Sequence, residues 1–322
     1  MLTQMKQKAI MATRLLCAVT LLAGLISLAA PLHWLADLLA NLRVQIVVGG
    51  TVAMLFALFA GQYRMATAVI GCLAVVVGLM SGELLPVTQT NNRKDADIFR
   101  LMTINVLSSN QNHGAVIGEI LGSDPDAVAV LELTNELQQT LDVALSNRYP
   151  HSVERGDAAG NFGIALYSKH PLTAVELFRL NEQIDSIAAD CHGWRLYATH
   201  PLPPIGRRQF RSRNEHLDLL ARHVHRYRGQ HPDVSVAVMG DFNLTPWSPL
   251  FRRFRDATGL RRAKVGFGLQ PTWYAKGSWF PLGLVLDHIF VPETAVCLSQ
   301  QVGPDIGSDH RSVTVDVCRV SR

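Results

Sequence analysis

The chain has 322 residues, of which 48% are hydrophobic and 17% are charged, and its formal net charge is +4. This length suits one large domain or two ordinary ones, and the small basic excess does not by itself identify a partner. The five cysteines show no Cys-x-x-Cys spacing, which excludes a metal site of that kind. A disulfide between Cys297 and Cys318 stays open for an oxidising compartment.

Three apolar runs dominate the first 85 residues, and each is about as long as a helix that crosses a bilayer core. They cover about residues 15–35, 44–60 and 65–82. The first run could instead be a cleaved signal peptide, because a basic leader precedes it, but two further runs follow at once and favour a helix bundle. We therefore predict a membrane anchor over residues 1–85 with three transmembrane helices.

Basic residues predict how this anchor is oriented. Lys6, Lys8 and Arg14 favour a cytoplasmic N-terminus, and Arg64 in the second short connection agrees, whereas Arg43 in the first connection opposes it. An odd number of spans then exports the rest of the chain. We expect a multi-pass protein of a bacterial inner membrane with its soluble domain in the periplasm.

The segment 86–97 is polar and aperiodic, which predicts a linker before a soluble domain over residues 98–322. In that domain short apolar or alternating runs predict strands, among them "FRLMTINVL", "AVAVLEL", "FGIALYS", "WRLYATH", "VSVAVMGDF", "LDHIFV" and "RSVTVDV". Helical patterns lie between several of them, and strands outnumber helices. The pattern favours a mixed α/β or α+β sheet sandwich, and without a glycine-rich phosphate loop nucleotide-dependent chemistry has no support.

Polar residues stand where many of these strands begin or end. They are Asn105, Glu132, His200, Asp241, Asn243, Asp287, His288, Asp309 and His310. Taken singly, an Asp or Asn after a strand is typical of a turn residue that bonds its own backbone, and a lone His is more often structural than catalytic.

Glu132 is the hardest of them to explain in this way, because it interrupts an otherwise apolar strand, where an unpaired carboxylate is costly. A hard cation would relieve that cost, and Mg²⁺ needs only one or two protein carboxylates, which leaves room for phosphate oxygens. An Asp beside a His makes a competent general base near neutral pH. These residues predict metal-assisted attack of water on a phosphate ester.

In "GDFN", Asp241 and Asn243 occupy positions i and i+2, which a strand places on one face. We interpret the stretch as a strand end at which a carboxylate and an amide both reach one phosphate while Phe242 turns into the core.

In chain order, "TIN", "LEL", "GIALYSKHPL", "ATH", "GDFN", "LDHIFV" and "GSDHRSV" resemble the motifs of the endonuclease/exonuclease/phosphatase superfamily, which has the DNase I-like fold. The resemblance covers essentially the whole soluble domain. It implies a four-layer sandwich of two mostly antiparallel sheets flanked by helices. With three leading spans, the chain is most similar to membrane-anchored bacterial members of the YafD-like type.

The resemblance also implies a cofactor, Mg²⁺ with Mn²⁺ as a substitute, and roles for individual residues. Glu132 would be the principal metal ligand, with Asn105 beside it. His310 would be the general base, oriented by Asp287. Asp309 would contact the metal or the attacking water, and its role is the least secure against that of Asp241.

The remaining motif residues would act on the phosphate. Asp241 and Asn243 would position the nucleophile and the scissile phosphate, and His200 would hydrogen-bond the phosphate or assist the leaving group.

The substrate is where the sequence is least informative. Arg208 and Arg211 follow the His200 loop, which makes them candidates for phosphate contact. Trp247 could stack on a base, dip into a membrane interface or pack beneath its own loop. A second aromatic segment, "TWYAKGSWFPLG", carries Trp273, Tyr274, Trp279 and Phe280.

Three hypotheses follow. The first is a membrane-anchored, Mg²⁺-dependent phosphodiesterase, with a nuclease as its leading form. The second is a phosphodiesterase or phosphatase that acts on phospholipid or inositol-phosphate head groups. The third is a binding protein without activity, which the filled catalytic positions disfavour.

Overall fold

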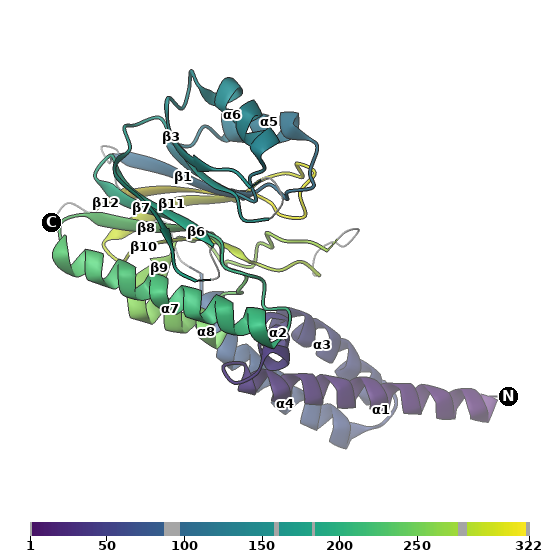
Figure 1. The fold of residues 1–322 in the computed structure, drawn as a ribbon. Helices are drawn as coiled ribbons and strands as arrows, with labels where there is room; N and C mark the ends of the chain where they lie inside the picture. Colours follow the sequence, from purple (N-terminus) through teal and green to yellow (C-terminus); the bar gives the residue numbers. More distant parts are fainter. Residues whose placement is uncertain (1, 87–96, 158–160, 182–183, 276–281, 320–322) are drawn as a thin grey trace.

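The computed structural model describes residues 2–86, 97–157, 161–181, 184–275 and 282–319. A helix bundle from the N-terminal part lies against one side of a sandwich of two sheets (Figure 1). The bundle contains α1 (Leu2–Ile26), the 3-10 helix η1 (Ser27–Ala29), α2 (Trp34–Asn41), α3 (Arg43–Phe59) and α4 (Tyr63–Leu84).

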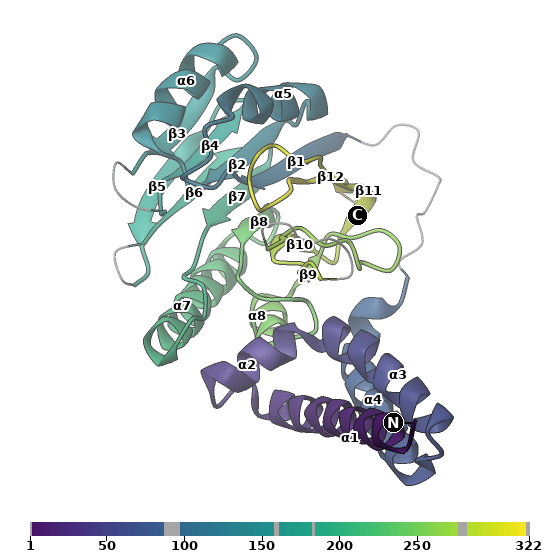
Figure 2. The ribbon, with the colours of Figure 1, turned by 90° about the vertical axis from the view of Figure 1, so that its right-hand side faces the viewer.

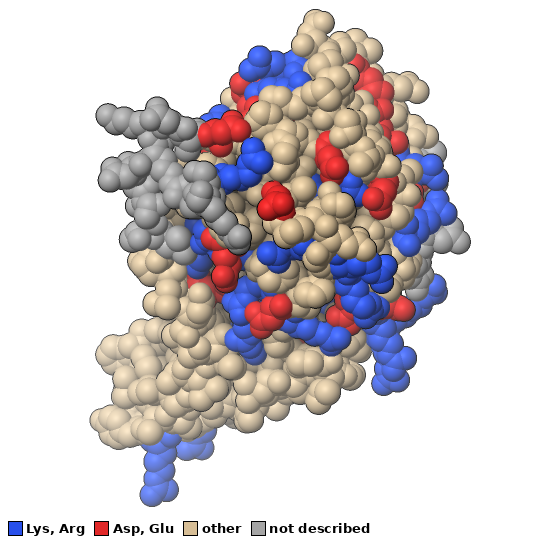
Figure 3. Space-filling view, turned by 90° about the vertical axis from the view of Figure 1, so that its left-hand side faces the viewer, with Lys and Arg blue, Asp and Glu red and all other residues tan. Residues whose placement is uncertain are grey.

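The bundle supplies two or three candidate membrane spans. Gln4–Ala29 and Tyr63–Leu84 are each long and apolar enough to cross a membrane, and α2 with α3 forms a third candidate that is bent by 70°. The first span ends at Ala29, earlier than predicted, because Pro31 lacks the N–H that a continuing helix needs. Figure 3 shows a bundle surface with few charges, except for basic side chains at the end far from the sandwich.

Each sheet has six strands. The first has the order β11-β12-β1-β2-β4-β3. Its strands are β1 (Ile98–Asn105), β2 (Ala127–Leu131), β3 (His151–Arg155), β4 (Ile164–Ser168), β11 (Ala295–Val302) and β12 (Val313–Arg319). The second has the order β5-β6-β7-β8-β10-β9. Its strands are β5 (Thr173–Arg179), β6 (Asp185–Cys191), β7 (Trp194–Thr199), β8 (Ser235–Asp241), β9 (Leu260–Arg262) and β10 (Asp287–Pro292).

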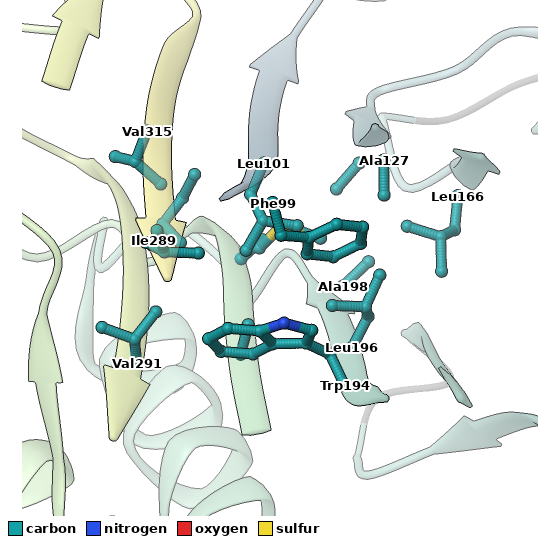
Figure 4. Close-up of a cluster of buried hydrophobic side chains, with 14 of the residues drawn as sticks. Phe99, Leu101, Ala127, Leu166, Trp194, Leu196, Ala198, Ile289, Val291 and Val315 are labelled. Carbon is teal, nitrogen blue, oxygen red and sulfur yellow. The ribbon is translucent and has the colours of Figure 1, made fainter. Parts of the chain in front are cut away.

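Apolar side chains hold four layers together. Between the sheets, inward-facing residues such as Leu101, Leu196, Ile289 and Val315 form one core (Figure 4). The outer face of the first sheet is covered by α5 (His113–Ser123) and α6 (Asn135–Leu145). The outer face of the second is covered by α7 (Arg207–Gln230) and α8 (Pro249–Thr258), as Figure 2 also shows. The predicted α+β sandwich is therefore confirmed.

The strand pairing decides where the polar strand ends meet. Most pairs are antiparallel, but β1 pairs with β2 and β7 with β8 in parallel, so the carboxyl ends within each pair lie together. In the antiparallel pair of β8 and β10, Asp241 at the end of β8 faces Asp287 at the start of β10. Both sheets thus bring polar residues to one end of the sandwich.

Candidate active site

Asp241, Asp287 and His310 form the centre of the site. His310 Nδ1 lies 2.8 Å from Asp287 Oδ2, and His310 Nε2 lies 3.6 Å from Asp241 Oδ2. All three side chains are almost fully buried. The carboxylate of Asp287 therefore fixes the tautomer and the direction of the imidazole, whose other nitrogen points toward Asp241.

Asn105 and Glu132 join this centre from the first sheet. Asn105 Nδ2 donates to Glu132 Oε1 at 2.9 Å and lies 3.4 Å from Asp241 Oδ2, and the Ser108 N–H donates to Glu132 Oε2 at 3.1 Å. Glu132 does not interrupt a strand as we predicted. It follows the last residue of β2 with a φ of 60°, and this left-handed backbone turns its carboxylate toward the site.

His200 comes from the end of β7, and its Nε2 lies 3.4 Å from Asp241 Oδ2. The neighbouring strand approaches very closely at this point. A Cβ on Gly240 would lie only 1.9 Å from the Thr199 carbonyl oxygen, so position 240 of β8 requires glycine. This close approach brings His200 and Asp241 together at the carboxyl ends of two parallel strands.

Asn243 differs from the prediction. β8 ends at Asp241, and Asn243 has a φ of 50°, so the alternation of a strand does not reach it. Its N–H donates to Asp241 Oδ1 at 2.8 Å, which is a turn of the kind that Asp commonly makes, and its Nδ2 donates to the Pro201 carbonyl at 3.0 Å. Phe242 is fully buried, as expected.

Asp309 lies beside the centre and is held by an aromatic residue. The Trp273 indole N–H donates to Asp309 Oδ2 at 2.8 Å, and the Tyr274 N–H donates to the Asp309 carbonyl at 2.8 Å. Asp309 Oδ1 is buried, and no described residue hydrogen-bonds to it. Trp273 thus binds a site carboxylate, whereas Trp279 and Phe280 lie outside the described residues.

Electrostatics hold these side chains in defined charge states. Burial opposes a charge on His310, but the carboxylates of Asp287 and Asp241 outweigh it and raise the pKa of His310 to about 10. For His200, burial is likewise outweighed by Asp241 and Glu132, and the pKa is raised above its ordinary value. In Asp241, burial is outweighed by the two histidines and by the N–H of Asn243, so its pKa is lowered.

The proposed substrate-binding residues lie in two different environments, two at the surface and one buried. Arg208 and Arg211 are exposed near the first turn of α7. Trp247 is only 3% exposed, its indole N–H donates to the Asn41 carbonyl at 3.0 Å, and its ring packs with Val76 and Met80 of α4. The idea of a stacking residue is wrong for Trp247, because its ring is taken up by contact with the bundle.

Supporting residues of the site were missed by sequence reasoning. Ser308 Oγ donates to the Asn105 carbonyl at 2.8 Å and accepts from the His310 N–H at 3.0 Å, so one hydroxyl ties the two motifs together. Thr272 Oγ1 accepts the N–H of Asp287 at 3.1 Å. Ser308 stands inside "GSDHRSV". Thr272 begins the aromatic segment "TWYAKGSWFPLG", which lies outside the motifs of the family resemblance. Cys297 and Cys318 are buried free thiols, which leaves the disulfide unformed.

The donor set suits a hard divalent cation. Ligand atoms of Asp241, Asp287 and His310 lie within 4.8 Å of one another. Asp287 Oδ1 is buried without a hydrogen-bond partner among the described residues. Carboxylate and amide oxygens are the ligands that Mg²⁺ and Mn²⁺ prefer. The residues present therefore fit such an ion. Glu132 adjoins Asn105 at the centre, and Asp309 Oδ1 is a buried carboxylate oxygen without a partner among the described residues.

Carboxylate, amide and imidazole groups gathered at the common end of a two-sheet α+β sandwich define the class of the protein, a hydrolase that acts on phosphoester bonds. A sequence model of the Endonuclease/Exonuclease/phosphatase family matches residues 102–310, and the chain belongs to this family. The resemblance seen in the motifs is therefore confirmed. No curated protein matches the chain.

Solved structures of the same fold agree. The 3' phosphatase NExo from Neisseria, bound to a product DNA hairpin, has 20% identity and a TM-score of 0.58, over 67% of this chain and 98% of that chain. The human Nocturnin catalytic domain with a bound sulfate anion has 19% identity and a TM-score of 0.55, over 70% and 98%. Humanized D. rerio TDP2 has 17% identity and a TM-score of 0.52, over 68% and 98%. At these identities the likeness shows the fold.

Proposed function

We propose that the protein is a membrane-anchored, divalent-metal-dependent phosphodiesterase, and that nucleic acid is its leading substrate. The observation that carries the proposal is the ordered contact of Asp287, His310 and Asp241, with Glu132 and Asn105 adjoining it. Such an array can deprotonate a water, orient it and stabilise charge on a phosphate without a covalent intermediate.

Each residue has a defined task in this proposal. Asp287 orients His310, whose Nε2 accepts a proton from the attacking water. Asp241 holds that water next to the imidazole, and His200 donates a hydrogen bond to a phosphate oxygen. Asn243 acts chiefly by fixing the Asp241 carboxylate through its N–H.

Glu132 and Asn105, with Asp309 nearby, would hold the cation. A divalent cation there would neutralise charge on the phosphate and, by offsetting the nearby carboxylates, lower the pKa of His310 toward neutrality. That change suits His310 to its role, because an imidazole with a pKa of about 10 carries a proton at neutral pH.

Two findings support a nucleic acid substrate. The Neisseria neighbour is a 3' phosphatase bound to a DNA hairpin. In this chain Arg208 and Arg211 are exposed at the start of α7, shortly after His200 in the sequence, and guanidinium groups suit contacts with a phosphate backbone.

A phospholipid or inositol-phosphate head group is the second candidate, and a different observation favours it. The loop from Asn243 to Trp247 begins two residues after Asp241 and packs on α2. Gln45 of α3 donates to the Gly283 carbonyl at 3.0 Å. The site is thus built next to helices that we expect to lie in a bilayer, where head groups are the most abundant phosphodiesters.

The test uses the full-length protein in detergent micelles, because bundle residues contact the loop of the site. Hydrolysis of single-stranded DNA, duplex DNA, RNA, phosphatidylinositol phosphates and sphingomyelin is measured with Mg²⁺, with Mn²⁺ and with EDTA. We expect cleavage of nucleic acid that EDTA abolishes. Substitution of His310→Ala or Glu132→Ala should lower kcat by at least about 100-fold, because each removes a general base or a metal ligand.

His225→Ala is the matched control, since His225 is exposed on α7 and belongs to no part of the site. It should keep the wild-type rate. Hydrolysis of head groups but not of nucleic acid would select the second candidate. Wild-type activity in His310→Ala would show that the mechanism is wrong.

A further inference from the structure

A buried ion pair joins the bundle to the catalytic domain next to the active site. Asp37 of α2 and Arg213 of α7 are both fully buried, and Arg213 Nη2 lies 2.8 Å from Asp37 Oδ2. Charged side chains are rarely buried completely unless they are paired, because desolvation is costly. The contact therefore ties α2 to α7 in one defined arrangement, and Figures 1 and 2 show α2 beside the N-terminal part of α7.

Arg213 also reaches the loop that follows Asp241. Its Nη1 donates to the Asn243 carbonyl at 3.0 Å, while the N–H of Asn243 donates to Asp241 Oδ1 at 2.8 Å. A chain of hydrogen bonds thus runs from the Asp37 carboxylate of the bundle, through Arg213 and the Asn243 backbone, to the Asp241 carboxylate of the site.

Asn41, one helical turn after Asp37, holds the next part of the loop. Its Oδ1 accepts from both the N–H and the hydroxyl of Thr245, at 2.7 and 2.9 Å, and its carbonyl accepts from the Trp247 indole. Asp37 and Asn41 are spaced i and i+4 and so lie on one face of α2. In the otherwise apolar "WLADLLAN", this polar face is turned to the catalytic domain.

The first residue of α3 completes the contact. Arg43 is buried and donates to the Trp247 carbonyl and to the Ser27 carbonyl. The loop from Asn243 to Trp247 therefore has polar groups at three positions bonded to side chains or backbone of the α2 region or to Arg213.

We propose that α2 is a structural part of the active site, and that Asp37, Asn41 and Arg213 are positioning residues that hold the loop after Asp241 in its catalytic geometry. The inference rests on the proposed function for its kinetic consequence. The physical reason is that the Asn243 N–H fixes Asp241 Oδ1 while the Asn243 carbonyl is held by Arg213, so the position of this loop sets the direction of the Asp241 carboxylate.

The experiment compares full-length variants in detergent micelles with bis(p-nitrophenyl) phosphate as a small soluble substrate. The double variant Asp37→Ala with Arg213→Met removes both charges of the pair, so that neither Asp37 nor Arg213 is left buried without the other. We expect its melting temperature to stay within a few degrees of the wild type, its kcat to fall about tenfold and its KM to change less than about twofold. That split marks a contact which acts on the reacting geometry and not on binding.

A second variant gives a readout that does not depend on activity. Asn41→Leu has a similar shape but removes the acceptor of the Thr245 N–H, so hydrogen exchange at that amide should become at least about tenfold faster. The control is Glu176→Ala with Arg195→Met, which removes another buried arginine and one of its two acidic partners, Glu176 and Asp190, at the far end of β7 from His200. It should keep the wild-type kcat and the slow exchange of Thr245.

Three outcomes decide the matter. A kcat within twofold of wild type in the Asp37→Ala, Arg213→Met protein would overturn the inference, and so would an equal fall in the control. If the wild type hydrolyses no phosphoester, the proposed function is wrong, and exchange at Thr245 then decides alone whether α2 holds the loop: faster exchange in Asn41→Leu supports this, and unchanged exchange rejects it.

Discussion

His216 of α7 is a buried histidine that the structure keeps uncharged. Its Nε2 lies 2.7 Å from the Thr199 hydroxyl and its Nδ1 lies 3.2 Å from Asn181 Oδ1, so a neutral ring with one donor and one acceptor nitrogen is satisfied. Burial, with a smaller effect of His200, lowers the pKa of His216 to about 3. The ring supports β7 immediately before His200 and has no place in the chemistry.

This depressed pKa predicts acid sensitivity. In the unfolded chain His216 binds a proton below a pH of about 6.5, whereas in the folded protein it does so only near pH 3. Its contribution to stability is therefore complete above pH 6.5 and is lost as the pH falls toward 3, by roughly 1 kcal/mol per pH unit. We expect the melting temperature of the wild type to fall between pH 7.5 and 4.5, and to fall less steeply in His216→Gln.

His225→Gln is the control for this experiment, because His225 is exposed on the same helix. Its melting temperature should follow the wild type at every pH. The explanation fails if His216→Gln shows the same pH dependence as the wild type.

At the scale of elements, the site depends on how closely β7 and β8 approach. Gly240 pairs with Thr199 in the parallel register, where it leaves no room for a Cβ. We expect Gly240→Ala to push the strands apart, to lower the free energy of unfolding by about 2 kcal/mol or more and to lower kcat, since His200 and Asp241 flank this contact. Chemical unfolding followed by circular dichroism, together with the phosphodiesterase assay, measures both effects.

Gly229→Ala is the matched substitution, because a Cβ on Gly229 in α7 meets nothing within 4 Å. It should leave the rate unchanged and stabilise the helix by roughly 0.5–1 kcal/mol. Equal behaviour of the two alanine variants would contradict the role given to Gly240.

Across the whole molecule, hydrogen bonds indicate which ends of the bundle face the catalytic domain. Arg43 at the start of α3 and Ser27 after α1 are bonded to each other beside Trp247. Lys264 donates to the carbonyls of Glu83 and Leu85 at the end of α4. Arg43 therefore serves in docking, so its position in the first connection says little about orientation. At the opposite end, Arg14 near the N-terminus contacts Gln62 between α3 and α4.

This arrangement predicts that the N-terminus and the catalytic domain lie on opposite sides of the membrane. Alkaline phosphatase is a suitable reporter because it folds to an active enzyme only after export. We expect it to be active in a bacterial host when it is fused to the C-terminus and inactive when it is fused to the N-terminus. An inactive C-terminal fusion would contradict a periplasmic catalytic domain and would favour two spans, with α2 and α3 outside the count.

The fold class and the chemical character of the site could be predicted from the sequence alone. Periodic apolar runs indicate strands and spans because burial of apolar surface drives folding. Carboxylates and imidazoles next to buried strands indicate a site because an unpaired charge is costly to bury. The order of the motifs along the chain also identified a set of site residues that the structure brings together. They are Asn105, Glu132, His200, Asp241, Asp287 and His310.

The way these residues face one another and the contacts that the N-terminal helices make with the site depend on the tertiary structure. The left-handed backbone at Glu132 depends on long-range contacts, among them the hydrogen bond from Asn105, that no local pattern records. Trp247 has the sequence character of an exposed aromatic residue, but its partner Asn41 lies in α2, in a distant part of the chain. Asp37 gives no signal of its link to Arg213, because a pairing between distant segments is fixed by packing and not by spacing.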